Sequence, residues 1–138
     1  MRLALRSLAA LALMAHAAGG AAGEAGPNWT QVAADDGIFT AYADRGTIRR
    51  EGASTFMRGM YDFRRGDLTP EGHLFHSTTV EREYDCAGRR VRLLAYEDHA
   101  QRFGEGPVVG SARSVRRWEE IVEGSVDSAF LALACSPD

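Results

Sequence analysis

Histidines are the side chains of this sequence best suited to hold a metal ion. His73 and His76 stand three positions apart, and His99 is distant from both. Positions three apart in a strand point to opposite faces, so this pair converges only if the loop around Gly72 bends. A zinc site needs three or four convergent ligands. We therefore expect loop or surface histidines, no metal site and no cofactor.

The acidic candidates for catalysis also have structural explanations. Asp44 precedes Arg45-Gly46, and an aspartate at the start of a turn ordinarily bonds its own backbone. Glu119 and Glu120 are neighbours in a predicted strand, so their side chains face opposite ways and do not form an acid/base pair. The sequence contains neither a G-x-S-x-G serine nor a glycine-rich phosphate loop. We predict no catalytic residue and no enzymatic activity.

The first 22 residues predict a secretory signal peptide. Arg2 and Arg6 are basic, residues 7–18 are apolar, and small residues follow at suitable cleavage positions. The apolar run is shorter than the roughly 20 residues that span a bilayer. No cysteine lies near the cleavage region, so a lipid cannot be attached to a new N-terminal cysteine. We expect one domain over residues 23–138, periplasmic or secreted, without stable membrane insertion.

The two cysteines, Cys86 and Cys135, are candidates for a disulfide. An even number of cysteines in an exported chain favours a bridge, and the alternatives are two free thiols or a catalytic thiol. The closed loop would contain about 50 residues, which in the chain-entropy model stabilises the fold by about 4 kcal/mol. We predict the bridge.

The charge balance of the chain argues against a nucleic-acid-binding protein. Sixteen basic and 19 acidic residues give −3; removing residues 1–22 takes away two arginines and no acids, so 14 against 19 gives −5. Nucleic-acid binders usually carry a net basic patch. No lysine is present, which excludes lysine bases and Schiff-base chemistry. Arg64-Arg65 and Arg116-Arg117 are candidate contacts for an acidic partner, with solvated strand ends as the alternative.

Glycines and polar turns divide the rest of the chain into short strands. The strand candidates are residues 29–33, 38–44, 47–50, 55–63, 74–86, 90–97 and 108–121. This spacing favours an antiparallel sheet of about six strands, because a parallel sheet would need helical crossovers. Ser125 as an N-cap, followed by apolar residues at helical spacing, predicts a C-terminal helix of about three turns before Pro137. The predicted fold class is therefore α+β.

A two-residue turn at Ala87-Gly88 sets the register of the predicted hairpin on either side of it. Opposite charges then meet on one side and apolar residues on the other: Asp85–Arg90 and Glu83–Arg92, and Tyr84–Val91 and Val80–Ala95. Arg82 and Leu94 break this alternation, so we expect a partly exposed strand there. Cys86 shares the side of Tyr84, and a bridge to Cys135 would hold the helix over the sheet. The charge cluster is interpreted as the solvated face of a hairpin.

Five aromatic residues are expected to lie mostly in the core of so small a domain. They are Trp29, Trp118, Tyr42, Tyr61 and Tyr84. Beside an exposed arginine, one or two of them could instead anchor a partner protein, because tryptophan, tyrosine and arginine dominate binding hot spots.

Six segments in this order span nearly all of the mature chain, and none of them is a catalytic signature. They are Trp29, YADRGTI at 42–48, MYDF at 60–63, EREYDC at 81–86, Trp118 within RRWEEI, and EGS…ALAC at 123–135. The ordered set resembles the surface-adhesin protein E family. The resemblance implies an exported protein of Gram-negative bacteria, with a C-terminal helix held by a disulfide on the concave face of a small sheet. It also implies an outer-membrane adhesin for host matrix and serum proteins, although the lipid-anchor cysteine is missing here.

We therefore predict an exported, non-enzymatic binding or structural envelope protein of this type. It would recognise a host or envelope protein through its disulfide-tied sheet, including strand addition at an exposed edge. The alternative is a small periplasmic ligand-binding protein or hydrolase that uses the concavity of the sheet. A pocket beside the helix, with His73, His76 or Asp44 converging on it, would favour that alternative. A monomer and a homodimer are both compatible with the sequence.

Overall fold

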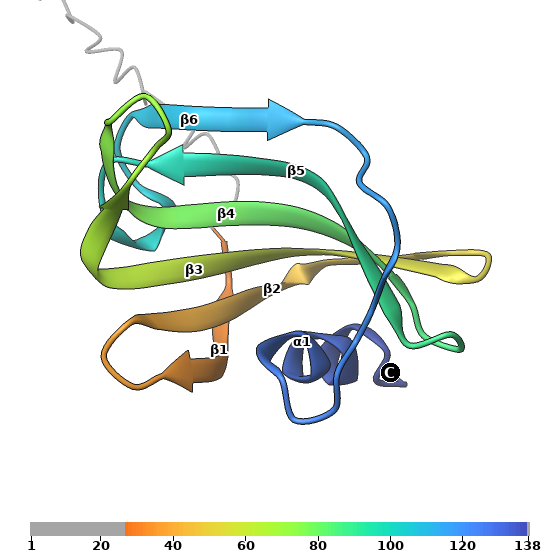
Figure 1. Cartoon of the computed structure of the whole chain (residues 1–138). Coiled ribbons are helices and arrows are strands. Elements are labelled where there is room, and N and C mark those ends of the chain that lie inside the picture. Colours follow the sequence, from red (N-terminus) through yellow and green to blue (C-terminus); the bar gives the residue numbers. More distant parts are fainter. Residues whose placement is uncertain (1–26, 138) are drawn as a thin grey trace, which may run out of the picture.

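The computed structural model describes residues 27–137, and the predicted signal peptide over 1–22 lies outside them. The strands are β1 (Trp29–Asp35), β2 (Phe39–Glu51), β3 (Ser54–Leu68), β4 (Leu74–Asp85), β5 (Arg90–His99), β6 (Val108–Arg113) and β7 (Glu119–Glu120). The helices are a short 3-10 helix, η1 (Arg102–Gly104), and an α-helix, α1 (Val126–Ala134). Figure 1 shows this order.

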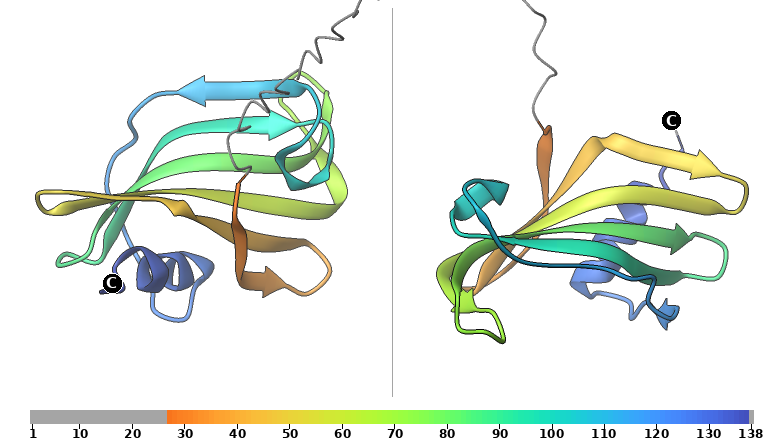
Figure 2. Two further views of the ribbon diagram at one scale, coloured as in Figure 1. Left: turned by 180° about the vertical axis from the view of Figure 1, so that it is seen from behind. Right: turned by 90° about the horizontal axis from the view of Figure 1, so that it is seen from above.

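The strands form one antiparallel sheet in the order β1-β2-β3-β4-β5-β6. Strand β7 pairs with Arg90 and Val91, the first two residues of β5. The sheet curls so that β1 approaches α1, which contacts β1, β2 and β3 (Figures 1 and 2). The segment after β6 runs beside β5 down to the helix (Figure 1). The predicted α+β class, with an antiparallel sheet and a C-terminal helix, is confirmed.

The core lies between α1 and the sheet. Its buried members are Ala41, Ala43, Met57, Tyr84, Val91, Ile121, Phe130, Leu131 and Ala134. Small residues on β2 and β3 let the helix come close to the backbone. At Gly59 a Cβ atom would lie 2.9 Å from a ring carbon of Phe130, so a larger residue there would push the helix away from the sheet.

The predicted disulfide between Cys86 and Cys135 is present. The two Cα atoms are 5.8 Å apart and the S–S bond is 2.07 Å long. Cys86 directly follows β4, and Cys135 is the residue that ends α1. At the other end of the helix, the Ser125 hydroxyl accepts a hydrogen bond from the Ser128 N–H, as expected for an N-cap. The bond therefore ties the C-terminal end of the helix to the β4–β5 hairpin.

The register of that hairpin follows the prediction up to Arg92. Asp85 faces Arg90, Glu83 faces Arg92, and Tyr84 faces Val91, as expected. A β-bulge then shifts the pairing by one residue, so that Val80 faces Tyr96 and the predicted Val80–Ala95 pair is wrong. The shift falls at Leu94, the residue that broke the alternation, because a bulge places two residues opposite one.

Three predicted strand boundaries are also wrong. The turn expected at Arg45-Gly46 is an irregularity inside β2, where the Asp44 Oδ1 accepts the Gly46 N–H at 3.1 Å. Strand β3 continues to Leu68 through the segment expected to be a loop, again with a register shift. The single strand expected over residues 108–121 is divided into β6 and β7. In the first two cases turn-forming residues bend the strand without reversing it.

A polar cluster lies on the face of the sheet opposite the helix α1. Asp62 follows Tyr61, which packs against Phe130 of the helix, so alternation places Asp62 on the opposite face. Its buried carboxylate accepts hydrogen bonds from the Arg102 Nε at 3.0 Å and the Phe103 N–H at 2.9 Å. These contacts hold the loop that contains η1 against the sheet.

Candidate recognition site beside the C-terminal helix

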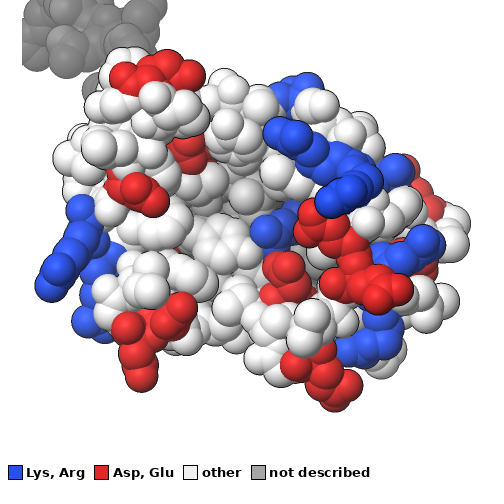
Figure 3. All heavy atoms as spheres, viewed as in Figure 1, with Lys and Arg blue, Asp and Glu red and all other residues white. Residues whose placement is uncertain are grey.

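A cleft of about 760 Å³ opens between β5, residues 114–119 and the first turn of α1. Its lining combines basic, acidic and apolar side chains: Arg82, Val91, Arg92, Leu93, Ser114, Val115, Arg116, Arg117, Glu119 and Asp127. Figure 3 shows this side of the molecule, which is hollowed near its centre, with the densest group of acidic and basic side chains to the right of the hollow. The cleft falls within the range of about 300–1,000 Å³ that is typical of ligand sites.

Arg82 lies in this cleft and is largely buried. Its Nη1 donates hydrogen bonds to the Tyr61 hydroxyl at 2.9 Å and to Asp127 Oδ1 at 3.0 Å. The Arg82 side chain is 16% exposed and that of Asp127 is 38% exposed. The guanidinium also lies over the rings of Tyr61 and Phe130, at 5.4 and 5.5 Å from their centroids. Arg82 therefore joins β4 to the first turn of the helix, where a partly exposed strand was expected.

The surroundings of Arg82 keep it charged. Burial by itself would lower the pKa of Arg82, but the tyrosine oxygens of Tyr61 and Tyr84 and the carboxylate of Asp127 raise it above its ordinary value. Burial raises the pKa of Tyr84 to about 12, and it raises the pKa of Tyr61 in the same direction. The three groups together form a fixed cation surrounded by neutral phenols near neutral pH.

Other arginines complete the basic lining of the cleft. Arg92 pairs with Glu83 at 2.6 Å and lies over the ring of Trp118, 4.5 Å from its centroid. Arg116 and Arg117 are exposed, and within residues 27–137 neither forms an ion pair. These two residues are the predicted basic pair, and the structure places both in the cleft. Their role in binding stays a prediction.

The second predicted basic pair lies elsewhere. Arg64 and Arg65 are exposed on β3 and do not line the cleft. The lining of the cleft holds four arginines and two acids, Glu119 and Asp127, and Glu83 neutralises Arg92 from outside the lining, which leaves an excess of one positive charge. The whole chain carries −3, so the cleft is a locally basic region of an acidic protein.

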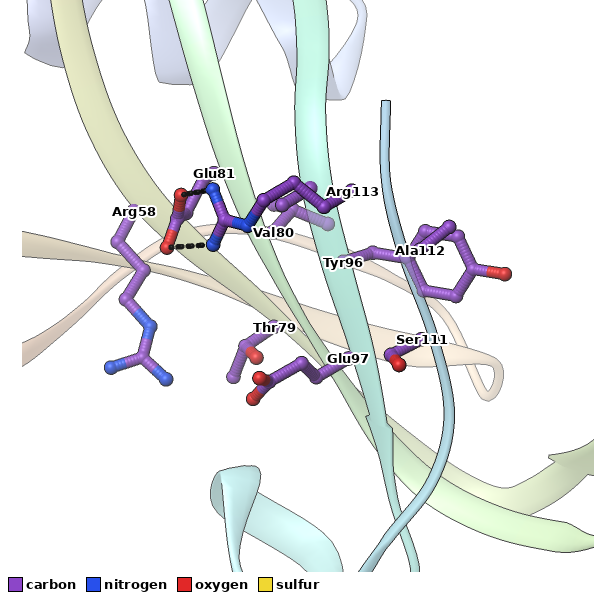
Figure 4. A pocket seen from close by; sticks show the side chains of 10 residues that line it. Arg58, Thr79, Val80, Glu81, Tyr96, Glu97, Ser111, Ala112 and Arg113 are labelled. Carbon is purple, nitrogen blue, oxygen red and sulfur yellow. Dashed lines mark hydrogen bonds and ion pairs between the residues drawn. The ribbon is translucent and has the colours of Figure 1, made fainter. Parts of the chain in front are cut away.

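A smaller pocket of about 310 Å³ lies on the other side of β4 and β5. Figure 4 shows the Arg113 and Glu81 side chains joined across it, with Arg58 and Glu97 nearby. Two arginines and two glutamates line this pocket, so its charges cancel. The existing pair between Arg113 and Glu81 occupies the groups that a charged ligand would need. We therefore take the larger, basic cleft as the candidate site.

The histidines do not converge on either site. His73 Nδ1 lies 3.4 Å from the Val109 carbonyl oxygen, and His76 Nδ1 lies 2.8 Å from that of Ala100. The His99 ring is buried, with Nε2 3.0 Å from the Thr79 hydroxyl. Over residues 27–137, no three histidine, cysteine or acidic residues are grouped as metal ligands would be.

The acidic residues considered as catalytic candidates do not come together in the cleft. Asp44 bonds to the backbone within its own irregularity, which is the local contact expected for an aspartate at a turn. Glu119 and Glu120 are both exposed on β7, opposite Val91 and Arg90. Only Glu119 lines the cleft.

None of the helices over residues 27–137 is long and apolar enough to cross a bilayer.

Of the five aromatic residues expected mostly in the core, only Tyr84 is fully buried. Trp29, Tyr42, Tyr61 and Trp118 are half-buried. Three of these four lie near an arginine: Trp29 at Arg58, Tyr61 at Arg82, and Trp118 at Arg90 and Arg92. One short helix does not cover the whole surface of the sheet, and arginine side chains stacked on these aromatic rings cover part of the remainder.

Sequence reasoning missed the pairing of Arg82 with Asp127. The signal was present, since Arg82 shares strand parity with Tyr84 and Cys86, and Asp127 lies in the first turn of the predicted helix. An arginine on the apolar side of a strand needs a counter-charge from the element packed there. That element is the helix, and Asp127 is its first acidic residue.

Comparisons with known proteins agree with this architecture. The family model described as "Surface-adhesin protein E" matches residues 29–136. A crystal structure of Haemophilus influenzae protein E (crystal form II) has a TM-score of 0.59 at 11% identity, covering 80% of this chain and 96% of that one. Protein E from non-typeable H. influenzae gives a TM-score of 0.54 at 13% identity, covering 78% and 84%. No curated protein sequence matches significantly. The chain belongs to the surface-adhesin protein E family.

Proposed function

We propose that this chain is an exported, non-enzymatic recognition protein that binds a host or envelope protein through a preorganised surface. Membership of the surface-adhesin protein E family supports binding as the general role. The N-terminal sequence, with its basic, apolar and small-residue parts, supports export to the periplasm or the medium. The partner is a protein in this proposal, and the binding surface includes the helix and the strands beside it.

The observation that carries the proposal is that α1 is fixed to the sheet at both ends. Asp127 in its first turn pairs with Arg82 of β4, and Cys135 at its end is bonded to Cys86. A surface made of two elements keeps one shape only if the elements cannot move apart. Fixing them before binding reduces the conformational entropy lost on association, which favours recognition of a folded partner.

The arrangement of charged groups supports a binding role over catalysis. The side chains of His73, His76 and Asp44, whose convergence on a pocket beside the helix would favour the alternative, do not line the cleft. The buried ionisable groups near the helix are Arg82, Tyr61 and Tyr84, and their pKa directions keep them in one protonation state near neutral pH. A general acid or base needs a pKa close to the working pH.

A binding panel tests the proposal. Protein exported through its own N-terminal sequence would be immobilised and exposed to purified matrix, serum and envelope proteins at micromolar concentration. We expect saturable binding to at least one of them, and weaker binding after reduction of the disulfide. Uniformly negative results with correctly oxidised protein would remove the recognition function.

A ligand-binding role is the second candidate, because the cleft beside the helix is open and has the volume of a small-molecule site. Screening the same protein by thermal shift against small anions and metabolites separates the two roles. A stabilising small molecule together with a negative protein panel would favour the ligand-binding alternative.

A further inference from the structure

We propose that the cleft beside the helix is a carboxylate-binding site that takes an extended acidic segment of a partner protein. Arg116 and Arg117 would contact its carboxylates, and Arg82, paired with Asp127, would hold the wall of the cleft in place. This inference rests on the proposed recognition function and names the chemistry of its partner. It also explains why a protein with net charge −3 concentrates four arginines at one cleft.

The four arginines divide into two that are neutralised and two that are available. Arg92 is paired with Glu83, and Arg82 with Asp127. Arg116 and Arg117 form no ion pair within residues 27–137 and are exposed. Exposed guanidinium groups bind carboxylates in a planar, two-point geometry, which makes this pair the natural contact for an incoming acid.

Arg82 still contributes to the site although it already has partners. Both of its hydrogen bonds use Nη1, and Asp127 is itself partly exposed. Because Asp127 neutralises Arg82 and is the more exposed of the two, the pair adds no net positive charge to the cleft, and its contribution is to fix the first turn of α1 to β4. Arg82 is therefore a positioning residue for the cleft wall, and Arg116 and Arg117 are the contacts.

Apolar side chains and a free backbone edge favour a peptide over a sulfated sugar or a free phosphate. Val91, Leu93 and Val115 line the cleft between the arginines, and Val115 is 62% exposed. Such surface suits a segment in which acidic and apolar residues alternate. A glycan or a phosphate would leave the exposed Val115 and half-buried Leu93 side chains in water, whereas Val91 is already buried.

The backbone of residues 114–117 offers the second feature that a peptide needs. The N–H groups of Ser114 and Arg116 donate to the carbonyl oxygens of Leu94 and Leu93 on β5. No described residue accepts the intervening N–H of Val115, which belongs to the outer side of this extended segment. A partner strand pairing there would place alternate side chains toward the cleft.

Fluorescence anisotropy with a dye-labelled peptide of alternating glutamate and valine tests the inference on the exported, oxidised protein. We expect the double variant Arg116→Ser/Arg117→Ser to bind at least about ten-fold more weakly, since losing two charge-assisted contacts is worth at least one decade in affinity. The matched control Arg64→Ser/Arg65→Ser removes the same net charge from β3 and is expected to bind within about two-fold of the unchanged protein. A peptide of alternating glutamine and valine is expected not to bind.

Three results would overturn the inference. Equal weakening in both double variants would show that net charge alone attracts the peptide. Tighter binding of a heparin hexasaccharide, with no binding of the peptide, would assign the cleft to sulfated glycans. If the Arg116→Ser/Arg117→Ser protein does not fold, amide NMR shifts in the unchanged protein decide the question. Shifts on peptide addition must then fall at residues 114–119 and β5, and shifts confined to other regions refute the site.

This test is separable from the test of the proposed function. If a partner protein binds the Arg116→Ser/Arg117→Ser variant as well as the unchanged protein, the cleft inference fails and the recognition function stands. If the peptide binds at the cleft but the protein panel is negative, the recognition function fails while the cleft remains an acidic-peptide site.

Discussion

The two faces of the sheet are each joined to a covering element by one buried ion pair, and the two pairs are built in opposite senses. On the helix side the arginine is the buried member: Arg82 is 16% exposed and Asp127 is 38% exposed. On the loop side the acid is the buried member: Asp62 is 0% exposed and Arg102 is 51% exposed. Each pair links residues at least 40 positions apart in the chain.

The loss of stability on substitution depends on whether the member left behind is buried or exposed. When one partner is removed, a buried charge keeps its desolvation penalty, whereas an exposed charge is rehydrated. The helix side has the disulfide as a second link. The loop side depends on the hydrogen bonds of Asp62 and on the hydroxyl of Ser77 in β4, which accepts the Gly104 N–H at 2.8 Å. We therefore expect the two sides to respond differently to the same kind of substitution.

Removing the disulfide should lower the stability of the protein most, because it removes the covalent link that only the helix side has. For Cys86→Ala/Cys135→Ala, which opens a loop spanning 49 positions, we expect a loss of about 4 kcal/mol in the free energy of unfolding. Urea unfolding followed by circular dichroism measures it, with reduced wild-type protein as the control. A loss below about 1 kcal/mol would contradict the entropic account.

Asp62→Asn should have the next largest effect and should act on the loop side. The buried carboxylate accepts charge-assisted hydrogen bonds from Arg102 and a further bond from the Phe103 N–H. Unlike an apolar replacement, asparagine keeps a buried polar group: its amide NH2 would face the Arg102 guanidinium or the Phe103 N–H, both donors, and stay without an acceptor. The variant therefore loses charge-assisted bonds and gains a buried unsatisfied donor, and we expect a loss of about 3 kcal/mol.

Hydrogen exchange should rise in residues 100–107 of this variant and stay unchanged in α1. Asp36→Asn, at an exposed acid in the β1–β2 turn, is the matched control and should be silent. Faster exchange in the helix instead of the loop would show that the two sides are not independent.

The helix-side pair should show an order of effects set by burial. Asp127→Ala leaves Arg82 buried without its counter-charge, and we expect a loss of about 2 kcal/mol. Arg82→Met removes the buried charge and leaves Asp127 to water, so we expect about 1 kcal/mol or less. Thermal unfolding of both variants and of the double variant measures the coupling. A larger loss for Arg82→Met would reverse the interpretation of which member matters.

Disrupting the Glu83–Arg92 pair of the hairpin should give one of the smallest losses of stability among these variants. Burial by itself would raise the pKa of Glu83, but hydrogen bonds from Arg92 and Ser54 lower it below its ordinary value. A lowered folded-state pKa stabilises the protein above the unfolded-state pKa, about 4.3, and this contribution is lost as pH falls below it.

The Glu83 side chain is only 8% exposed, but a glutamine oxygen can still accept a hydrogen bond from Arg92 or Ser54. In Glu83→Gln we therefore expect a loss of about 1 kcal/mol at neutral pH and a flatter decline of stability in acid. Melting temperatures across the acidic range measure the slope, and Glu97→Gln, at an exposed glutamate of β5, is the control. An unchanged acid limb in the Glu83 variant would contradict the proposed role of this pair.

The hairpin shows how far sequence reasoning reaches. Its turn and its charge pattern predicted the register correctly from Asp85–Arg90 to Glu83–Arg92. Beyond Leu94 the prediction was wrong by one residue: Leu94 interrupts the alternation, but that interruption alone does not distinguish a bulge from a partly exposed strand. The same limit applies to Asp44, whose local backbone contact was expected but whose turn proved to be a bend within β2.

The candidate site was predicted less well than the fold. Arg116-Arg117 and Arg64-Arg65 looked equivalent in the sequence, since each is an arginine pair near a strand end. The structure separates them, placing only the first pair in the cleft with Arg82. Nothing in the local sequence of either pair indicates which one the curled sheet brings beside the helix.

The sequence by itself determined the disulfide partners, the hairpin register near its turn and the capped C-terminal helix. Each follows from composition or from interactions within one or two neighbouring elements, which residue spacing encodes directly. Only the tertiary structure decided the pairing of Arg82 with Asp127, the pairing of Asp62 with Arg102 and the cleft beside the helix. These depend on how a bulged sheet curls, and that curvature sums small twists over many strands, so no single segment specifies it.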